Sequence, residues 1–224
     1  VEDWKQYGPM YWVPNYIDSQ RYLSVPKPRK DPDWITILYG SSMSHLPSFE
    51  DSGIEPALAN VFRKRKNVRF VLCGDERVFQ RLPVPENRKR YQRYVRAHEW
   101  PKILAQADIS LAPLARFYDH RRSDIKCSEA AVMGIPIVAT RSIIYEEYEK
   151  NNVGLFVKNG DYDGATYEER AIDWEAKLLD VIDNIKYYQE QAPKYIDFGL
   201  SYRDVDLNVS DIVRTYESII NRLT

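Results

Sequence analysis

The sequence predicts a doubly wound α/β domain built on a Rossmann-like parallel sheet. Short apolar, β-rich runs alternate with segments of helical spacing along most of the 224 residues. Such alternation with short links is typical of parallel strands joined by right-handed helical crossovers. The chain is 44% hydrophobic, so it can bury a full core. Its two cysteines indicate neither a disulfide framework nor a metal site, and a reducing, cytoplasmic compartment is the simplest interpretation.

The first βαβ unit is predicted close to the linker-like start of the chain. Residues 35–39 form a short apolar run, and residues 68–73 form another. Between them, residues 52–66 carry apolar side chains at the spacing of one helix face, with Leu58 and Val61 as examples. A strand, a helix and a second strand in this order predict two parallel neighbours in one sheet.

The later part of the chain repeats the same alternation. Each further strand is recognised as a short apolar run, and the last two helices have apolar residues every three or four positions. The expected elements are a strand at 94–97, a helix at 100–107, a strand at 109–111, a helix at 123–133, a strand at 137–139, a helix at 145–151, a strand at 155–157, and helices at 173–191 and 209–223.

The segment from Ser123 to residue 140 is the most informative part of the chain. Ser123 is expected to cap the helix at 123–133, and Gly134 follows that helix as a terminating glycine. Near the positive end of this helix, Arg122, Lys126 and Glu129 are spaced to share a face. Two cations and one carboxylate suit a phosphate with a sugar hydroxyl nearby, although a simple surface pair between Lys126 and Glu129 remains the alternative.

This segment resembles a known donor-site sequence. Asp124-x-Lys126-x-x-Glu129, followed by Ala-x-x-Gly-x-Pro-x-Val-Ala over residues 131–139, is similar to the corresponding segment of family-4 glycosyltransferases of the GT-B fold. Further pieces fall in the family's order, so the resemblance covers most of the chain. These pieces are residues 13–18, 39–45, 68–74, 108–114 and 154–157.

The resemblance implies glycosyl transfer from a nucleotide sugar, with retention of configuration and no cofactor or bound metal. Lys126 and Arg122 are then expected to stabilise the departing diphosphate, and Glu129 matches the family glutamate that holds the ribose. The family's other donor-site glutamate is replaced here by Arg121. Asp119 is the nearest acid that could substitute for it.

Other donor contacts are expected from the loops that follow the strands. In an open α/β sheet the ligand lies beyond the carboxyl ends of the strands. The loop after the first strand offers backbone N–H groups and hydroxyls to an anion, while the dinucleotide motif with three glycines is absent. The predicted donor-binding residues are Gly40, Ser41, Ser42, His45, Gly74, Ser123 and Glu129.

The expected domain organisation has two parts. Residues 1–33 are interpreted as a crossover and linker segment, and residues 34–224 as the nucleotide-sugar donor-binding domain. The resemblance implies that the acceptor is bound by a separate N-terminal domain, so the chain is expected to be half of an enzyme. The aromatic residues of positions 1–16 are expected to pack back on this domain or against the missing half.

The near-zero net charge hides an asymmetry. Residues 61–100 contain twelve lysines and arginines against four acidic residues, while residues 141–200 contain seven against thirteen. Within the first block, the basic residues of 81–96 suit either a nucleic-acid patch or peripheral contact with anionic lipid head groups. A solvated charged face is the simplest alternative.

Three other functions stay open at this point. The chain could bind a nucleotide sugar without catalysis, it could belong to a GT-B relative such as a nucleotide-sugar 2-epimerase, or it could bind nucleic acid. The nucleic-acid interpretation gives no role to Glu129 beside Lys126, so no nucleic-acid partner is expected. The base and sugar of the donor are not specified by the sequence.

Overall fold

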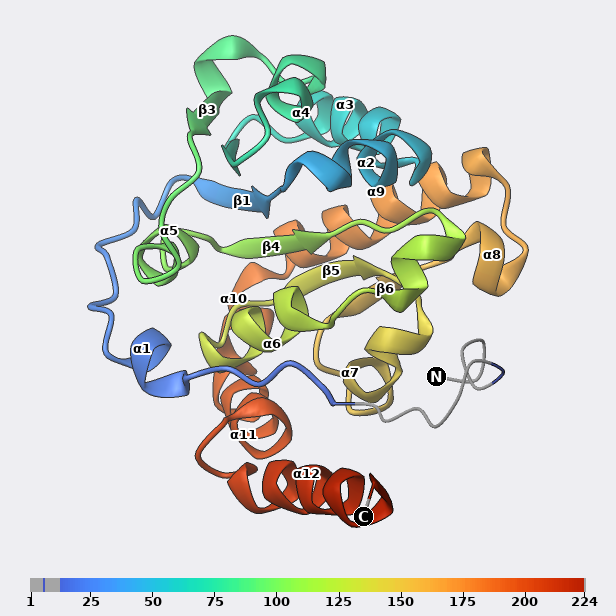
Figure 1. Ribbon diagram of the computed structural model, residues 1–224. Helices are drawn as coiled ribbons and strands as arrows, with labels where there is room; N and C mark the ends of the chain where they lie inside the picture. Colours follow the sequence, from blue (N-terminus) through green and yellow to red (C-terminus); the bar gives the residue numbers. More distant parts are fainter. Residues whose placement is uncertain (1–5, 7–12, 224) are drawn as a thin grey trace.

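A single six-stranded parallel sheet organises the protein (Figure 1). The computed structural model describes residues 6 and 13–223. The strand order is β3-β2-β1-β4-β5-β6, so the order of strands reverses between β1 and β4. The predicted doubly wound sheet is confirmed. The strands are β1 (Ile35–Gly40), β2 (Val68–Cys73), β3 (Lys89–Gln92), β4 (Ile109–Ala112), β5 (Ile137–Thr140) and β6 (Leu155–Val157).

Helices connect the strands and cover both faces of the sheet (Figure 1). Short 3-10 turns lie at Met43–His45, Glu86–Arg88, Phe117–Arg121 and Ile143–Tyr145. The helices are α1 (Ser19–Leu23), α2 (Leu46–Asp51), α3 (Ile54–Lys64), α4 (Glu76–Arg81), α5 (Trp100–Leu104), α6 (Ile125–Val132), α7 (Glu146–Lys150), α8 (Gly160–Asp163), α9 (Tyr167–Asp183), α10 (Ile185–Glu190), α11 (Ala192–Arg203) and α12 (Val209–Leu223).

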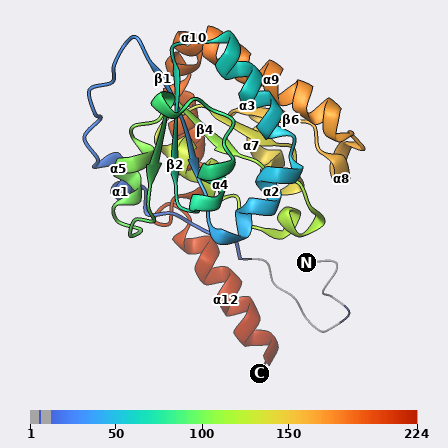
Figure 2. The same cartoon turned by 90° about the horizontal axis from the view of Figure 1, so that it is seen from above.

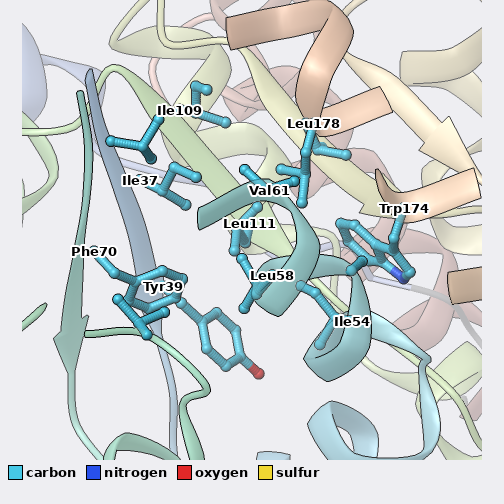
Figure 3. Close-up of a cluster of buried hydrophobic side chains, with 14 of the residues drawn as sticks. Ile37, Tyr39, Ile54, Leu58, Val61, Phe70, Ile109, Leu111, Trp174 and Leu178 are labelled. Carbon is cyan, nitrogen blue, oxygen red and sulfur yellow. The ribbon is translucent and has the colours of Figure 1, made fainter. Parts of the chain in front are cut away.

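The alternation of side chains along the strands builds two cores. In β1, Ile37 and Tyr39 pack into the core under α3 and α9, while Leu38 belongs to the opposite core with α6. The first core includes Trp174 of α9, which is fully buried against α3 (Figure 3). The second core holds α6 against the sheet and α11 against α6. α6 is therefore fixed on both sides.

Two expected elements differ from the structure, and some helices were not expected. The strand predicted at 94–97 is wrong: the edge strand is β3, which is polar and partly exposed and so gives no apolar signal. The helix predicted at 173–191 starts earlier, where Thr166 forms a capping box with Glu169, and it stops at Asp183. The sequence interpretation missed α11 altogether.

The start of α6 also differs from the expectation. Asp124 occupies the N-cap position and α6 begins at Ile125, so the prediction of Ser123 as the cap is wrong. Gly134 follows the helix with a φ of +66°, as expected for a terminating glycine. The helix therefore starts later than predicted but ends in the predicted way.

The segment before β1 is attached to the body of the domain. The backbone N–H of Ile17 donates to the carbonyl of Arg203, and the N–H of Val205 donates to the carbonyl of Ile17, both at 2.9 Å. After α1, residues 25–33 cross to β1 with exposed side chains and without regular secondary structure. The aromatic residues expected to pack near the start, at positions 4, 7, 11 and 12, lie outside the described residues. The boundary predicted at residue 33 stays a prediction.

The last helix projects from the rest of the domain, as Figure 2 shows for α12. Its apolar residues Val213, Tyr216 and Ile220 are largely exposed. Within the part of the chain that is described, no helix has the length and apolar character needed to cross a membrane.

Gly74 provides a stability test of the strand ends. Its φ is +125°, and a Cβ added there would lie 1.8 Å from the carbonyl oxygen of Ser41. We expect Gly74→Ala to lower the free energy of unfolding by at least about 2 kcal/mol. The matched control is Gly164→Ala, because Gly164 has a φ of +70° but no atom within 4 Å of the added Cβ. Its cost should be about 1 kcal/mol in urea titrations, and equal losses would contradict the prediction.

Candidate active site

A cavity of about 490 Å³ opens where the strand order reverses, at the carboxyl ends of β1, β2 and β4. This is the position at which open α/β sheets bind their ligands. Its walls come from the loop after β1, from α5 and α6, and from residues 16–18 and 21–22 of the segment before β1. Distant parts of the chain thus meet at one site.

The loop after β1 is held by its neighbours. Gly40 lies against the indole of Trp100, since a Cβ added at Gly40 would be 2.6 Å from that ring. The N–H of Ser41 donates to the carbonyl of Cys73 at 2.8 Å, and its hydroxyl accepts the N–H of Asp75 at 3.1 Å. Gly74 is needed for this close approach to Ser41, but it does not line the cavity. The loop therefore presents a fixed backbone to a ligand.

His45 closes this loop as a neutral hydrogen-bond donor. Its Nδ1 accepts the backbone N–H of Ser42 at 2.7 Å. The pKa of His45 is lowered to about 3, mainly by burial and also by the nearby charges of Lys126 and Arg122, while Asp119 acts in the opposite direction. Because Nδ1 accepts a hydrogen bond, the proton of the neutral ring resides on Nε2. His45 can thus donate one hydrogen bond to an anion without adding charge.

Lys126 supplies a cation from the first turn of α6. Its ammonium makes no hydrogen bond and no ion pair with the residues that the structure describes. Its pKa is lowered to about 8, mainly because of burial; the carboxylate of Glu129 opposes this shift, and the charge of Arg122 adds to it. The side chain is therefore charged at neutral pH and lacks a fixed partner, which makes it available to an anionic ligand.

Glu129 is held by two aromatic side chains. The Tyr22 hydroxyl donates to Oε1 at 2.5 Å, and Nε1 of Trp100 donates to Oε2 at 2.9 Å. Burial raises the pKa of Glu129, while these two hydrogen bonds and Lys126 act to lower it. A carboxylate oxygen accepts more than one hydrogen bond. Glu129 can therefore still accept a hydrogen bond from a hydroxyl group of a ligand.

A second cavity, of about 340 Å³, adjoins the first. The two cavities share His45, Ile125 and Lys126 in their walls. The smaller one is also lined by Arg122 and Ser123. Lys126 and His45 thus lie between the two cavities. Glu129 lines the larger cavity, and Arg122 lines the smaller one.

Asp119 and Arg122 form a buried pair beside the smaller cavity. Asp119 is 2% exposed and accepts the Ser48 hydroxyl at 3.0 Å and the N–H groups of residues 115 and 116. Nε of Arg122 lies 2.9 Å from Oδ1 of Asp119, and Nη2 of Arg122 donates to the carbonyl of Ser44 at 2.8 Å. In this arrangement Asp119 orients Arg122 and the loop around it. Its predicted catalytic role stays a prediction.

Arg121 occupies the position at which the resembled family has a glutamate. It is exposed, donates to the carbonyl of Phe117 at 2.9 Å, and its guanidinium lies 3.4 Å from the centre of the Phe117 ring. No described group of three or more His, Cys, Asp or Glu side chains is arranged to hold a metal ion.

The structure brings most of the predicted site residues together. Gly40, Ser41, Ser42, His45, Lys126 and Glu129 line the larger cavity, while Arg122 and Ser123 line the smaller one. The sequence interpretation missed Tyr22 and Trp100, which hold Glu129. Neither belongs to a short motif with Glu129, because they are 107 and 29 residues away from it.

The sequence of this site matches a known protein family. Residues 43–170 match the family model described as Glycosyl transferases group 1. The chain belongs to this family. The matched residues run from the loop after β1 into α9 and include His45, Lys126 and Glu129. The resemblance to GT-B glycosyltransferases is thereby confirmed, whereas no curated protein matches the sequence.

Several solved structures share the fold of this family member. Anabaena Alr3699/HepE in complex with UDP-glucose has a TM-score of 0.62 and 18% identity, over 91% of this chain and 56% of that one. Sucrose-phosphate synthase from Thermosynechococcus elongatus has a TM-score of 0.65 and 11% identity, over 99% and 56%. S. aureus TarM in complex with UDP has a TM-score of 0.61 and 14% identity, over 86% and 38%. The chain therefore spans only about half, or less, of these relatives.

The low pKa of Lys126 predicts how anion binding depends on pH. Between pH 7 and pH 9 the free side chain loses most of its charge, because its pKa is about 8. We expect the affinity for UDP to fall about tenfold over this range, since a bound anion keeps the lysine protonated. Calorimetric titrations at several pH values measure this slope. Lys126→Arg should remove it, because arginine stays charged, and an unchanged slope in that variant would rule out Lys126 as the titrating group.

Proposed function

We propose that this chain is the donor-binding domain of a glycosyltransferase that uses a nucleoside diphosphate sugar. The observation that carries the proposal is the position of Lys126, a cation that has no fixed partner among the described residues and that lies between two adjoining cavities. The nucleoside would occupy the larger cavity with its ribose hydroxyls on Glu129. The diphosphate would lie at Lys126 and His45, and the sugar would enter the smaller cavity.

The proposed reaction breaks the bond between the anomeric carbon and the diphosphate oxygen. An acceptor hydroxyl forms the new bond to that carbon and its proton passes to solvent, while the nucleoside diphosphate departs with its negative charge. Lys126, Arg122 and the N–H of His45 would stabilise this developing charge, which lowers the barrier more than it tightens ground-state binding. Because these groups are part of the protein, we also propose that no bound metal is needed. Retention of configuration is implied by the family resemblance.

The rest of the enzyme is part of the proposal. The acceptor would be bound by a domain that precedes this one, across a cleft that opens on the smaller cavity. The two buried cysteines, Cys73 and Cys127, are free thiols, which favours the proposed cytoplasmic location. UDP is the first nucleotide to test, since UDP is bound in the solved structures of HepE and TarM.

Binding of UDP-, GDP- and dTDP-sugars in EDTA tests the assignment of Lys126. We expect Lys126→Ala to weaken nucleotide-sugar binding, and to lower kcat by about 10²–10³ in the enzyme that includes its acceptor domain. Lys150→Ala is the control, because Lys150 is exposed and pairs with Glu146 and Glu147 away from both cavities. Binding that requires a divalent metal, or that is unchanged by Lys126→Ala, would refute the proposal.

Glu129 is tested through the sugar part of the nucleotide. Glu129→Gln keeps an oxygen for Trp100 and places an amide near Tyr22, so the wall of the cavity should be preserved. We expect it to weaken binding of free nucleoside and nucleoside diphosphate by similar factors of about tenfold, since both use the ribose contact. A loss confined to the diphosphate would mean that Glu129 acts only through Lys126. Formation of a C2 epimer from the donor alone would instead support the epimerase alternative.

A further inference from the structure

A separate cavity of about 670 Å³ lies at the other edge of the sheet, at the amino ends of β1, β2 and β3. One wall is formed by the segment that follows α1, which passes along this edge in Figure 1. Seven lysine and arginine residues line this cavity, and no aspartate or glutamate does. Its floor includes the apolar residues Phe70 and Val71. None of its lining residues belongs to the two cavities of the proposed donor site.

Three of the seven cations have structural partners. Lys30 pairs with Oδ1 of Asp108 at 2.9 Å, and Lys89 pairs with Glu86 at 2.6 Å. The buried guanidinium of Arg88 donates to the carbonyls of Arg65 and Phe62, which lie at the end of α3. These contacts stabilise the fold and account for the three side chains.

The other four cations have no carboxylate partner among the described residues. Nε of Arg69 donates to the Thr36 hydroxyl at 2.8 Å, and Arg90 donates to Gln106, which is also neutral. The side chains of Arg29 and Lys102 make no ion pair with the residues described. Four uncompensated positive charges around an apolar floor repel one another, and a concave wall focuses their potential.

We propose that this cavity binds a phosphate-bearing anion. Guanidinium groups match phosphate oxygens in bidentate geometry, and Arg29, Arg69 and Arg90 offer three of them from different segments. The volume suits a small ligand. Since Arg29 belongs to the segment between α1 and β1, the bound anion would fasten that segment to the sheet. The phosphate belongs either to a phospholipid head group or to a freely diffusing phosphorylated compound.

Pyrophosphate titration by calorimetry tests the site, with Lys126→Ala in every protein so that binding at the proposed donor site is weakened equally in all of them. We expect Arg29→Glu combined with Lys102→Glu to weaken binding at least about tenfold, since two attractive charges become repulsive. Lys158→Glu combined with Lys186→Glu is the matched control, because both lysines are exposed, lie outside the cavity and give the same change in net charge. The control should change the affinity less than about twofold. Lys102→Ala, a single exposed substitution, provides a milder variant with a smaller loss.

Vesicle sedimentation separates the two sources of phosphate. If the ligand is a lipid head group, phosphatidylglycerol vesicles should retain the control protein and release the Arg29/Lys102 variant, while phosphatidylcholine vesicles retain neither. Pyrophosphate binding without vesicle binding would assign the site to a soluble phosphorylated compound. No pyrophosphate binding, or equal losses in the variant and the control, would overturn the proposal. Since Lys126→Ala weakens the proposed donor site equally in every protein compared, the difference between the variant and the control reports on this cavity and does not bear on the proposed glycosyl transfer.

Discussion

The geometry of the proposed donor site depends on the buried ion pair between Asp124 and Arg203. Nε of Arg203 donates to Oδ2 of Asp124 at 2.7 Å, and both side chains are 5% exposed. The Tyr148 hydroxyl donates to the same oxygen at 3.1 Å. Because Asp124 occupies the N-cap position of α6, this pair fixes where the helix begins and thus where Lys126 and Glu129 point. Removing one partner of such a pair leaves a buried charge, at a cost of about 3–5 kcal/mol.

The same pair also places the segment that covers the site. The carbonyl of Arg203 accepts the N–H of Ile17, and Tyr22 lies one short helix further along the chain. Tyr22 then donates to Glu129, and the charge of Glu129 in turn partly offsets the burial of Lys126. The cation that the proposed reaction needs is therefore maintained by a chain of contacts that begins at α11. Apart from that between Glu129 and Lys126, which are three residues apart on α6, these contacts are not local in the sequence.

The difference between local and long-range contacts explains how much of the structure could be predicted from the sequence. Apolar strands and the glycine that ends α6 are determined by nearby residues, so the sheet and the helix with Lys126 and Glu129 were predicted correctly. β3 was not, because its sequence Lys-Arg-Tyr-Gln is polar and its pairing with β2 depends on tertiary context. Tyr22 and Trp100 were missed for the same reason, since only the folded chain brings them to Glu129.

The two edges of the parallel sheet provide different electrostatic environments. Helix amino ends gather at the carboxyl edge, where α6 begins beside the proposed diphosphate position, whereas helix carboxyl ends gather at the other edge. Cations at that second edge are expected to neutralise exposed carbonyls, and Arg88 does so at the end of α3. Lys102 lies in the last turn of α5, where a cation complements the helix dipole. Arg29, Arg69 and Arg90 bind no helix-end carbonyl through any contact that the structure records, so the helix dipoles do not account for these three. A strand of six residues separates the two edges by about 20 Å. Salt largely screens exposed charges that are more than roughly 8–10 Å apart. An anion in this basic cavity therefore has little electrostatic effect on the proposed donor site at the carboxyl edge.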